Sequence, residues 1–205
     1  MLPKTRLILA TLLAIALCAG AVQAADLDSL KKGTPDIKSA GPLAFGPEGI
    51  LFVGDPMGAA IFAIDTNDRP SSPATGALKV DKIDERVAAA LGTKADEVRI
   101  NDLAVSPVSG NAYLSVARGK GADAAPVILR VDRKAKIEEV PLKDVMFAKA
   151  AIPNAVEGKT RQEAITGLAY VKGKVYVAGL SNEQFASNLR AIPFPFKDAD
   201  KGASV

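Results

Sequence analysis

The polar residues with the clearest chemical potential stand at two kinds of position along apolar segments of the chain. One group directly precedes segments that begin with Leu-Ala or Gly-Leu-Ala, and it consists of Asn101, Asp102 and Thr166. A second group ends later segments rich in Val, Leu and Ala, and it consists of Asp55, Arg118 and Asn182. Carboxylates, amides, a hydroxyl and a guanidinium that converge could hold a cation or a small polar ligand. These six residues are the candidate ligand-binding residues.

Two of these positions also have a purely structural interpretation. Asp55 lies in the segment VGDPMG, where it could hold a cation or a sugar hydroxyl, or could cap a turn before Pro56. Asp side chains commonly accept hydrogen bonds from the backbone of their own turn. The pair Asn101-Asp102 leaves the same two alternatives open. Glu48, in a Pro-Glu-Gly turn, is expected to be a solvated acid.

The composition excludes several classes of catalytic site. The chain has no His and no Trp, and its one Cys is Cys18. A Ser-His-Asp triad therefore cannot be assembled, and zinc sites built on His and Cys are excluded. We predict no catalytic residues and no cofactor, and calcium, held by carboxylates and carbonyls, is the metal that this composition would favour.

The N-terminus has the pattern of an export signal. Lys4 and Arg6 precede an apolar run over residues 7–21, and the small residues of Val22-Gln23-Ala24 follow. The run is too short for a comfortable membrane span. We predict a signal peptide over residues 1–24, a periplasmic or secreted mature chain and no transmembrane segment in it. A lipoprotein anchored through Cys18 is the alternative, against which the bulky Leu17 argues.

The charge balance argues against nucleic-acid binding. Two of the 26 basic residues lie in the signal, so 24 remain against 23 acidic ones, and the formal net charge falls from +3 to +1. Nucleic-acid-binding proteins usually carry a concentrated basic face, and single-strand binders present stacking aromatic rings. The expected partner is instead an unidentified small molecule or protein.

One sequence motif recurs three times, and the structure that its copies form has to position the candidate residues. Each copy opens with Leu-Ala and an apolar residue, continues through a turn with Gly near its end, and leads into a second apolar segment. The copies begin at Leu43, Leu103 and Leu168. A repeat of this kind is stronger evidence for the fold than any single local pattern. The residues in its turns and in the flanking segments favour a β-hairpin.

Further strands extend each hairpin. Third strands are expected at Ala59–Asp65, Pro126–Arg133 and Asn188–Phe196, and fourth strands at Ala77–Ile83 and Lys136–Leu142. Helical segments are expected at Asp84–Gly92 and Lys143–Ala151, whereas the polar tail from Lys197 shows no fourth strand. A β-sandwich with similar hairpins is the alternative to this assignment.

Four antiparallel strands per repeat are typical of a β-propeller blade. The segment GPLAFGPEGILFVGDPMGAAIFAID resembles a blade of the broad propeller superfamily that includes NHL-repeat proteins, gluconolactonase- and regucalcin-like proteins and exported YncE-like propellers. The resemblance implies an all-β fold, an incomplete propeller of about three blades with short helices between them. We place the blades at about 37–92, 98–151 and 160–196 of a domain over 37–205, after a linker at 25–36.

The number of blades is small for a closed ring. Closed propellers typically have about four to eight blades, so we expect an incomplete N-terminal portion of a longer propeller. Pairing of two chains is the alternative, with self-association through open blade edges.

The sequence therefore favours an exported propeller-type binding or protein-interaction module without a catalytic site of its own. The resemblance also implies an alternative, the N-terminal part of a propeller enzyme such as a sugar-lactone hydrolase or a quinone-dependent dehydrogenase. Its site would be completed by missing blades or by a second chain.

Overall fold

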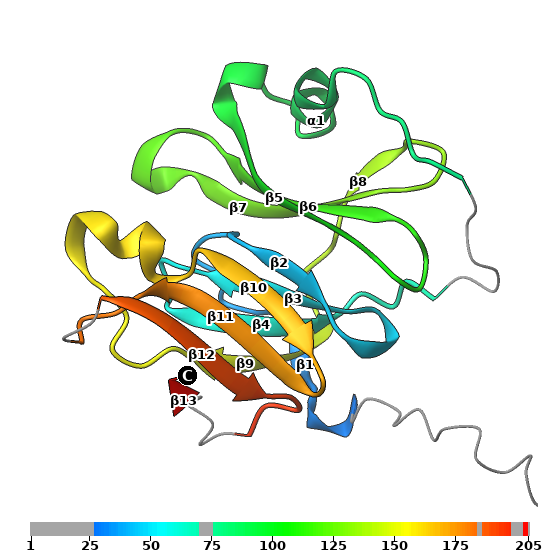
Figure 1. The fold of residues 1–205 in the computed structure, drawn as a ribbon. Coiled ribbons are helices and arrows are strands. Elements are labelled where there is room, and N and C mark those ends of the chain that lie inside the picture. Colours follow the sequence, from blue (N-terminus) through cyan, green and yellow to red (C-terminus); the bar gives the residue numbers. More distant parts are fainter. Residues whose placement is uncertain (1–26, 70–75, 184–185, 198–202, 205) are drawn as a thin grey trace, which may run out of the picture.

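The computed structural model describes residues 27–69, 76–183, 186–197 and 203–204, which form three antiparallel β-sheets (Figure 1). The predicted signal peptide lies outside these residues. The predicted all-β fold of antiparallel strands is confirmed. We number the sheets by the order in which the chain enters them.

Sheet 1 has five strands in the order β1-β9-β4-β3-β2. Their bounds are β1 Lys31–Gly33, β2 Leu43–Phe45, β3 Ile50–Asp55, β4 Ala60–Asp65 and β9 Val145–Ala151. The predicted linker thus contributes a short edge strand, because β1 pairs with β9.

Sheets 2 and 3 each contain four strands in chain order. Sheet 2 consists of β5 Val98–Val105, β6 Ala112–Arg118, β7 Ala125–Val131 and β8 Ile137–Glu139, and it follows helix α1 Ile83–Ala90. Sheet 3 consists of β10 Gly167–Val171, β11 Lys174–Leu180, β12 Ser187–Pro193 and β13 Ala203–Ser204. Short 3₁₀ segments lie at Leu27–Ser29, Pro47–Gly49, Ala95–Glu97, Gly121–Asp123 and Gly158–Ala164.

The three repeated hairpins and their third strands form as predicted. Gly49, Gly110 and Gly173, near the end of each hairpin turn, all have positive φ, at 78°, 71° and 79°. Side chains with a Cβ reach this backbone region only with strain, which explains why glycine recurs there. The repeated motif is therefore a hairpin with a specific turn.

Sheet 1 corrects two predictions about the fourth strands. The segment that was expected to be helical, Lys143–Ala151, contains β9, which pairs antiparallel with β4. Phe147 of β9 packs against Phe62, so pairing and burial override the helical propensity of its Met, Ala and Lys residues. The strand expected at Ala77–Ile83 does not form, and α1 begins there instead.

The tail also differs from its prediction. Ala203 and Ser204 form β13, which pairs with β12 and gives sheet 3 a short fourth strand. The predicted strand at Lys136–Leu142 is present as β8, and the helix predicted at Asp84–Gly92 is present as α1. Lys82 occupies the N-cap position of α1, and Asp84 lies in its first turn.

Sheet 1 lies between the other two sheets, so the order in space is sheet 2, sheet 1, sheet 3 (Figure 1). Ile50 and Phe52 of β3 belong to the core shared with sheet 3, whereas Leu51 and Val53 belong to the core shared with sheet 2. A third core lies between sheet 2 and α1. The inner strand β2 contacts both β5 and β10, so the inner edges of the three sheets converge.

The outer ends of this stack retain exposed apolar side chains. Val171 and Leu189 of sheet 3 are 48% and 42% exposed, and Leu103 and Val105 of sheet 2 are both 55% exposed. Leu103 pairs in register with Leu114, whose side chain faces α1. Because paired residues share a face of the sheet, the Leu103 side chain also points away from sheet 1.

We predict that Gly179→Ala destabilises the fold. A Cβ at Gly179 would lie 2.1 Å from the Ala164 carbonyl oxygen, so the backbone of the Gly158–Ala164 segment would have to move. We expect a loss of about 2 kcal/mol or more in the free energy of unfolding, measured by urea denaturation.

Gly167→Ala is the matched control, because a Cβ there would meet only the Cβ of Ala178, at 3.9 Å. We expect the control to change stability by less than about 0.5 kcal/mol. Equal stabilities of the two variants would contradict the proposed close approach.

Candidate ligand groove

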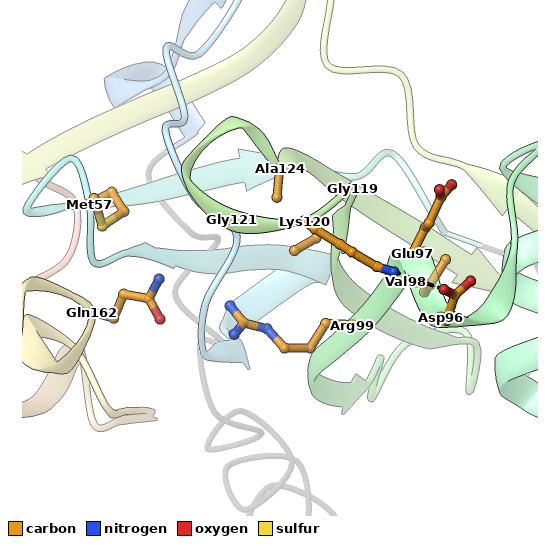
Figure 2. A pocket seen from close by; sticks show the side chains of 11 residues that line it. Met57, Asp96, Glu97, Val98, Arg99, Gly119, Lys120, Gly121, Ala124 and Gln162 are labelled. Atoms are coloured by element: carbon orange, nitrogen blue, oxygen red, sulfur yellow. Dashed lines mark hydrogen bonds and ion pairs between the residues drawn. The ribbon is translucent and has the colours of Figure 1, made fainter.

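A groove lies at the rim where loops from all three sheets converge. It consists of two cavities of about 520 Å³ and 270 Å³ that share Arg99 and Gln162 as lining residues. The larger cavity is lined mainly by the start of β5, the loop after β6 and Met57 (Figure 2). The smaller cavity lies beside the loop that precedes β2. We name these two joined cavities the rim groove.

The smaller cavity brings together two of the predicted site residues. Asn101 and Thr166 line it, although they come from sheets 2 and 3. Residues 39–42, Pro56 and Ile165 complete much of the wall. Thr166 directly precedes β10 and Asn101 lies within β5, and the two residues share this cavity.

Asp55 lines neither cavity and is almost fully buried, with 1% exposure. Its carboxylate accepts hydrogen bonds from the backbone N–H groups of Lys38, Ser39 and Gly58 and from the Ser39 hydroxyl. These bonds fix the loop before β2 against the turn after β3. The structure therefore gives Asp55 the role of a turn and loop organiser.

A β-bulge in β5 sets the directions in which the side chains of Asn101 and Asp102 point. The pairing of β5 with β6 shifts register between Ile100 and Asp102, and Asn101 is the extra residue. Asn101 donates a hydrogen bond to the Ala40 carbonyl, and Asp102 accepts one from the Leu43 N–H. Asp102 thus binds the first residue of the inner strand β2 and Asn101 binds the loop before it, so both buried-edge backbone groups gain a partner.

Arg99 extends into the rim groove with its orientation fixed at one end. Its Nε donates to the Asn101 Oδ1 at 2.9 Å, and Figure 2 shows its guanidinium pointing toward Gln162 and away from Asp96. Gln162 lies on the opposite wall, in the Gly158–Ala164 segment. Its neighbour Arg161 anchors that segment by donating hydrogen bonds to the carbonyls of Met57 and Val156.

Lys120 and Asp96 form an ion pair at the other end of the groove, with 2.8 Å between Nζ and Oδ2 (Figure 2). The hydrogen bond from Lys120, and then its charge, hold the pKa of Asp96 below its ordinary value. The same bond and charge raise the pKa of Lys120. Both groups therefore stay charged and largely neutralise each other.

Arg118 and Asn182 do not line either cavity, although both are exposed. Arg118 ends β6 opposite Val98, and the backbone N–H of Asn182 bonds to the Asn154 carbonyl.

Conversely, sequence reasoning missed Arg99 and Gln162. The alternation of polar residues in VRIND could have indicated Arg99, since i and i+2 share a face of a strand.

A second polar cluster, also missed, lies at the opposite rim around Asp68. This buried carboxylate accepts hydrogen bonds from the Ser109 and Tyr113 hydroxyls and from the Asn111 amide. Burial opposes ionisation of Asp68, but these three donors outweigh it and lower its pKa. Burial, and then the bond to Asp68, raise the pKa of Tyr113 to about 12. The cluster ties the segment after β4 to the β5–β6 turn.

Comparisons with known proteins assign this chain to no family. No family model matches it, and no curated protein matches it. A solved structure of a streptogramin B lyase is similar over 81% of this chain and 59% of that chain, with 12% identity and a TM-score of 0.27. The chain therefore spans less than two thirds of that protein.

The described residues contain no group of three or more His, Cys, Asp or Glu side chains placed to hold a metal ion. Among the same residues, no helix has both the length and the apolar character needed to cross a membrane.

We predict that Asp68→Asn destabilises the protein in a pH-dependent way. Asn presents an NH₂ group and a weaker acceptor to three donors, so we expect a loss of about 2 kcal/mol at pH 7. Because the folded-state pKa of Asp68 lies below the ordinary value of 3.8, its contribution is present above that pH and is lost as pH falls through the folded-state pKa.

Urea denaturation between pH 7 and pH 3 measures this effect. The stability difference between wild type and Asp68→Asn should shrink below about pH 4. Asp123→Asn, at an exposed residue, is the control and should leave the curve unchanged. A difference that stays constant with pH would refute the assignment.

Proposed function

We propose that the protein is an exported binding module that takes up a small polar ligand in the rim groove. One observation carries the proposal: loops from three sheets build one groove, and the side chains that shape it are held by hydrogen bonds to the framework. Asp55 fixes one wall, Asn101 fixes Arg99, and Arg161 fixes the segment that carries Gln162. Such pre-organisation lowers the entropic cost of binding.

The groove favours binding over catalysis. The described residues that line it supply amide and hydroxyl groups, a guanidinium, a neutralised Lys-Asp pair and the Glu97 carboxylate, which accepts a hydrogen bond from Thr93, rather than a nucleophile beside a base. Pockets that bind small molecules usually combine apolar walls with a few placed polar groups. Met57, Pro42, Pro56 and Ile165 provide such walls here.

A screen of small polar metabolites by thermal unfolding, with a groove-filling variant, tests this function. A ligand at 100 times its dissociation constant should stabilise the protein by about 2.7 kcal/mol. In Gln162→Trp the indole would occupy the groove, so we expect that stabilisation to disappear.

Glu163→Trp is the matched control, since Glu163 is the exposed neighbour that lines neither cavity. It should retain the stabilisation by every ligand that the wild type binds. The proposal fails if no ligand stabilises the wild type, or if Gln162→Trp responds as the wild type does.

We propose export on the sequence pattern of residues 1–24, and processing can be measured directly. In a Gram-negative host, the mature protein should appear in the periplasmic fraction with a mass that corresponds to cleavage after Ala24. Ala24→Tyr, which puts a bulky residue at the cleavage site, should accumulate as the precursor. An unprocessed wild-type chain in the cytosol would contradict export, and a lipid-modified mass would indicate anchoring through Cys18 instead.

A further inference from the structure

Arg99 has the geometry of a receptor for an oxyanion in the rim groove. Its Nε is engaged by Asn101, which itself is fixed by its bond to the Ala40 carbonyl. Among the described residues, none accepts a hydrogen bond from the two terminal nitrogens of Arg99, which lie in the groove (Figure 2). A guanidinium held at one nitrogen and free at the other two loses little side-chain entropy when it binds a ligand.

The charge of the cavity selects the kind of anion. Arg99 is the one charged residue among the described residues that line the smaller cavity. In the larger cavity Lys120 is paired with Asp96, and Glu97 adds a negative charge. A single positive charge with acidic groups nearby suits a monoanion better than a phosphate dianion, because a second negative charge would be repelled.

The neutral groups around Arg99 complement a carboxylate with a small organic body. Gln162 stands across the groove from Arg99 (Figure 2), and Thr166 lines the smaller cavity with both residues. Within the described structure the side chains of Gln162 and Thr166 make no hydrogen bonds. Pro42, Pro56 and Ile165 offer apolar contact beside them. A planar carboxylate can accept two parallel bonds from the terminal nitrogens of a guanidinium.

We propose that the rim groove recognises small organic monocarboxylates through a bidentate pair with Arg99, with Gln162 and Thr166 as neutral hydrogen-bonding partners. This inference rests on the proposed binding function and names its ligand class. Asn101 is a positioning residue, since it acts through Arg99. Sequence reasoning had assigned Asn101 itself as a ligand-binding candidate.

Titration followed by amide NMR tests the inference with simple probes. The probes are acetate, propionate and benzoate, each compared with its neutral amide at equal concentration, and inorganic phosphate. We expect the carboxylates to shift the signals of the Gln162 side-chain amide and the Thr166 backbone amide. The matching amides and phosphate should bind at least about tenfold more weakly, since they lose the charge-assisted pair or add a repelled charge.

Variants then identify the residue that is responsible. Arg99→Gln should weaken benzoate binding at least about tenfold, and Arg99→Lys should give an intermediate loss because it keeps the charge but not the fork. Arg118→Gln is the matched control: it removes the same charge from an exposed arginine of the same sheet that does not line the groove. Binding to it should stay within about twofold of wild type. The amide spectrum of each variant reports whether it is folded.

The outcomes separate this inference from the function on which it rests. Carboxylate binding that is lost in Gln162→Trp but unchanged in Arg99→Gln would overturn the role of Arg99 and leave the groove as a binding site. Tighter binding of phosphate than of benzoate, lost in Arg99→Gln, would overturn the monocarboxylate class. Absence of carboxylate binding by the wild type at millimolar concentration would also refute the inference, and neutral ligands that still bind the groove would preserve the broader function.

Discussion

Burial of β3 and β4 on both faces governs how the other two sheets are placed. The two strands contribute nine fully or nearly fully buried apolar residues: Ile50, Leu51, Phe52, Val53, Ala60, Ile61, Phe62, Ala63 and Ile64. Burying a large apolar side chain stabilises a fold by about 1.5–3 kcal/mol, so neither face of sheet 1 can be left to solvent. Sheet 3 covers one face and sheet 2 covers the other. The convergence of their inner edges on β2 follows from that arrangement.

Polar contacts then define the register between the sheets and shape the rim. Asp102 and Asn101 of sheet 2 bond to the backbone of β2 and of the loop before it. Asp68, after β4, accepts bonds from two side chains of the β5–β6 turn and from Tyr113 of β6. These two sets of hydrogen bonds lie at opposite ends of the interface between sheets 1 and 2, so each limits rotation of one sheet on the other. The set that contains Asn101 also orients Arg99. Structural hydrogen bonds and the candidate binding residue therefore belong to one network.

The repeats made much of the fold predictable. The hairpins, their turn glycines and the third strands are local features, and residues within a few positions of one another determine them. The fourth strand of sheet 1 was not predictable in this way, because β9 follows β4 by about 80 residues and its sequence has no strong β signal. The spatial order of the sheets was equally hidden, since it depends on which faces can be covered.

For the candidate site, the sequence alone determined that polar residues before the inner strands would converge, because repeated hairpins place equivalent positions at the same rim. That reasoning selected Asn101, Asp102 and Thr166, of which Asn101 and Thr166 line the smaller cavity. Only the tertiary structure decided the roles: Asp55 and Asp102 are used by backbone groups from distant segments, while Arg99 and Gln162 face the open groove. The physical reason is that a hydrogen bond depends on which donors and acceptors lie within reach in space, and the partners of Asp102 and Asn101 are about 60 residues away in the chain.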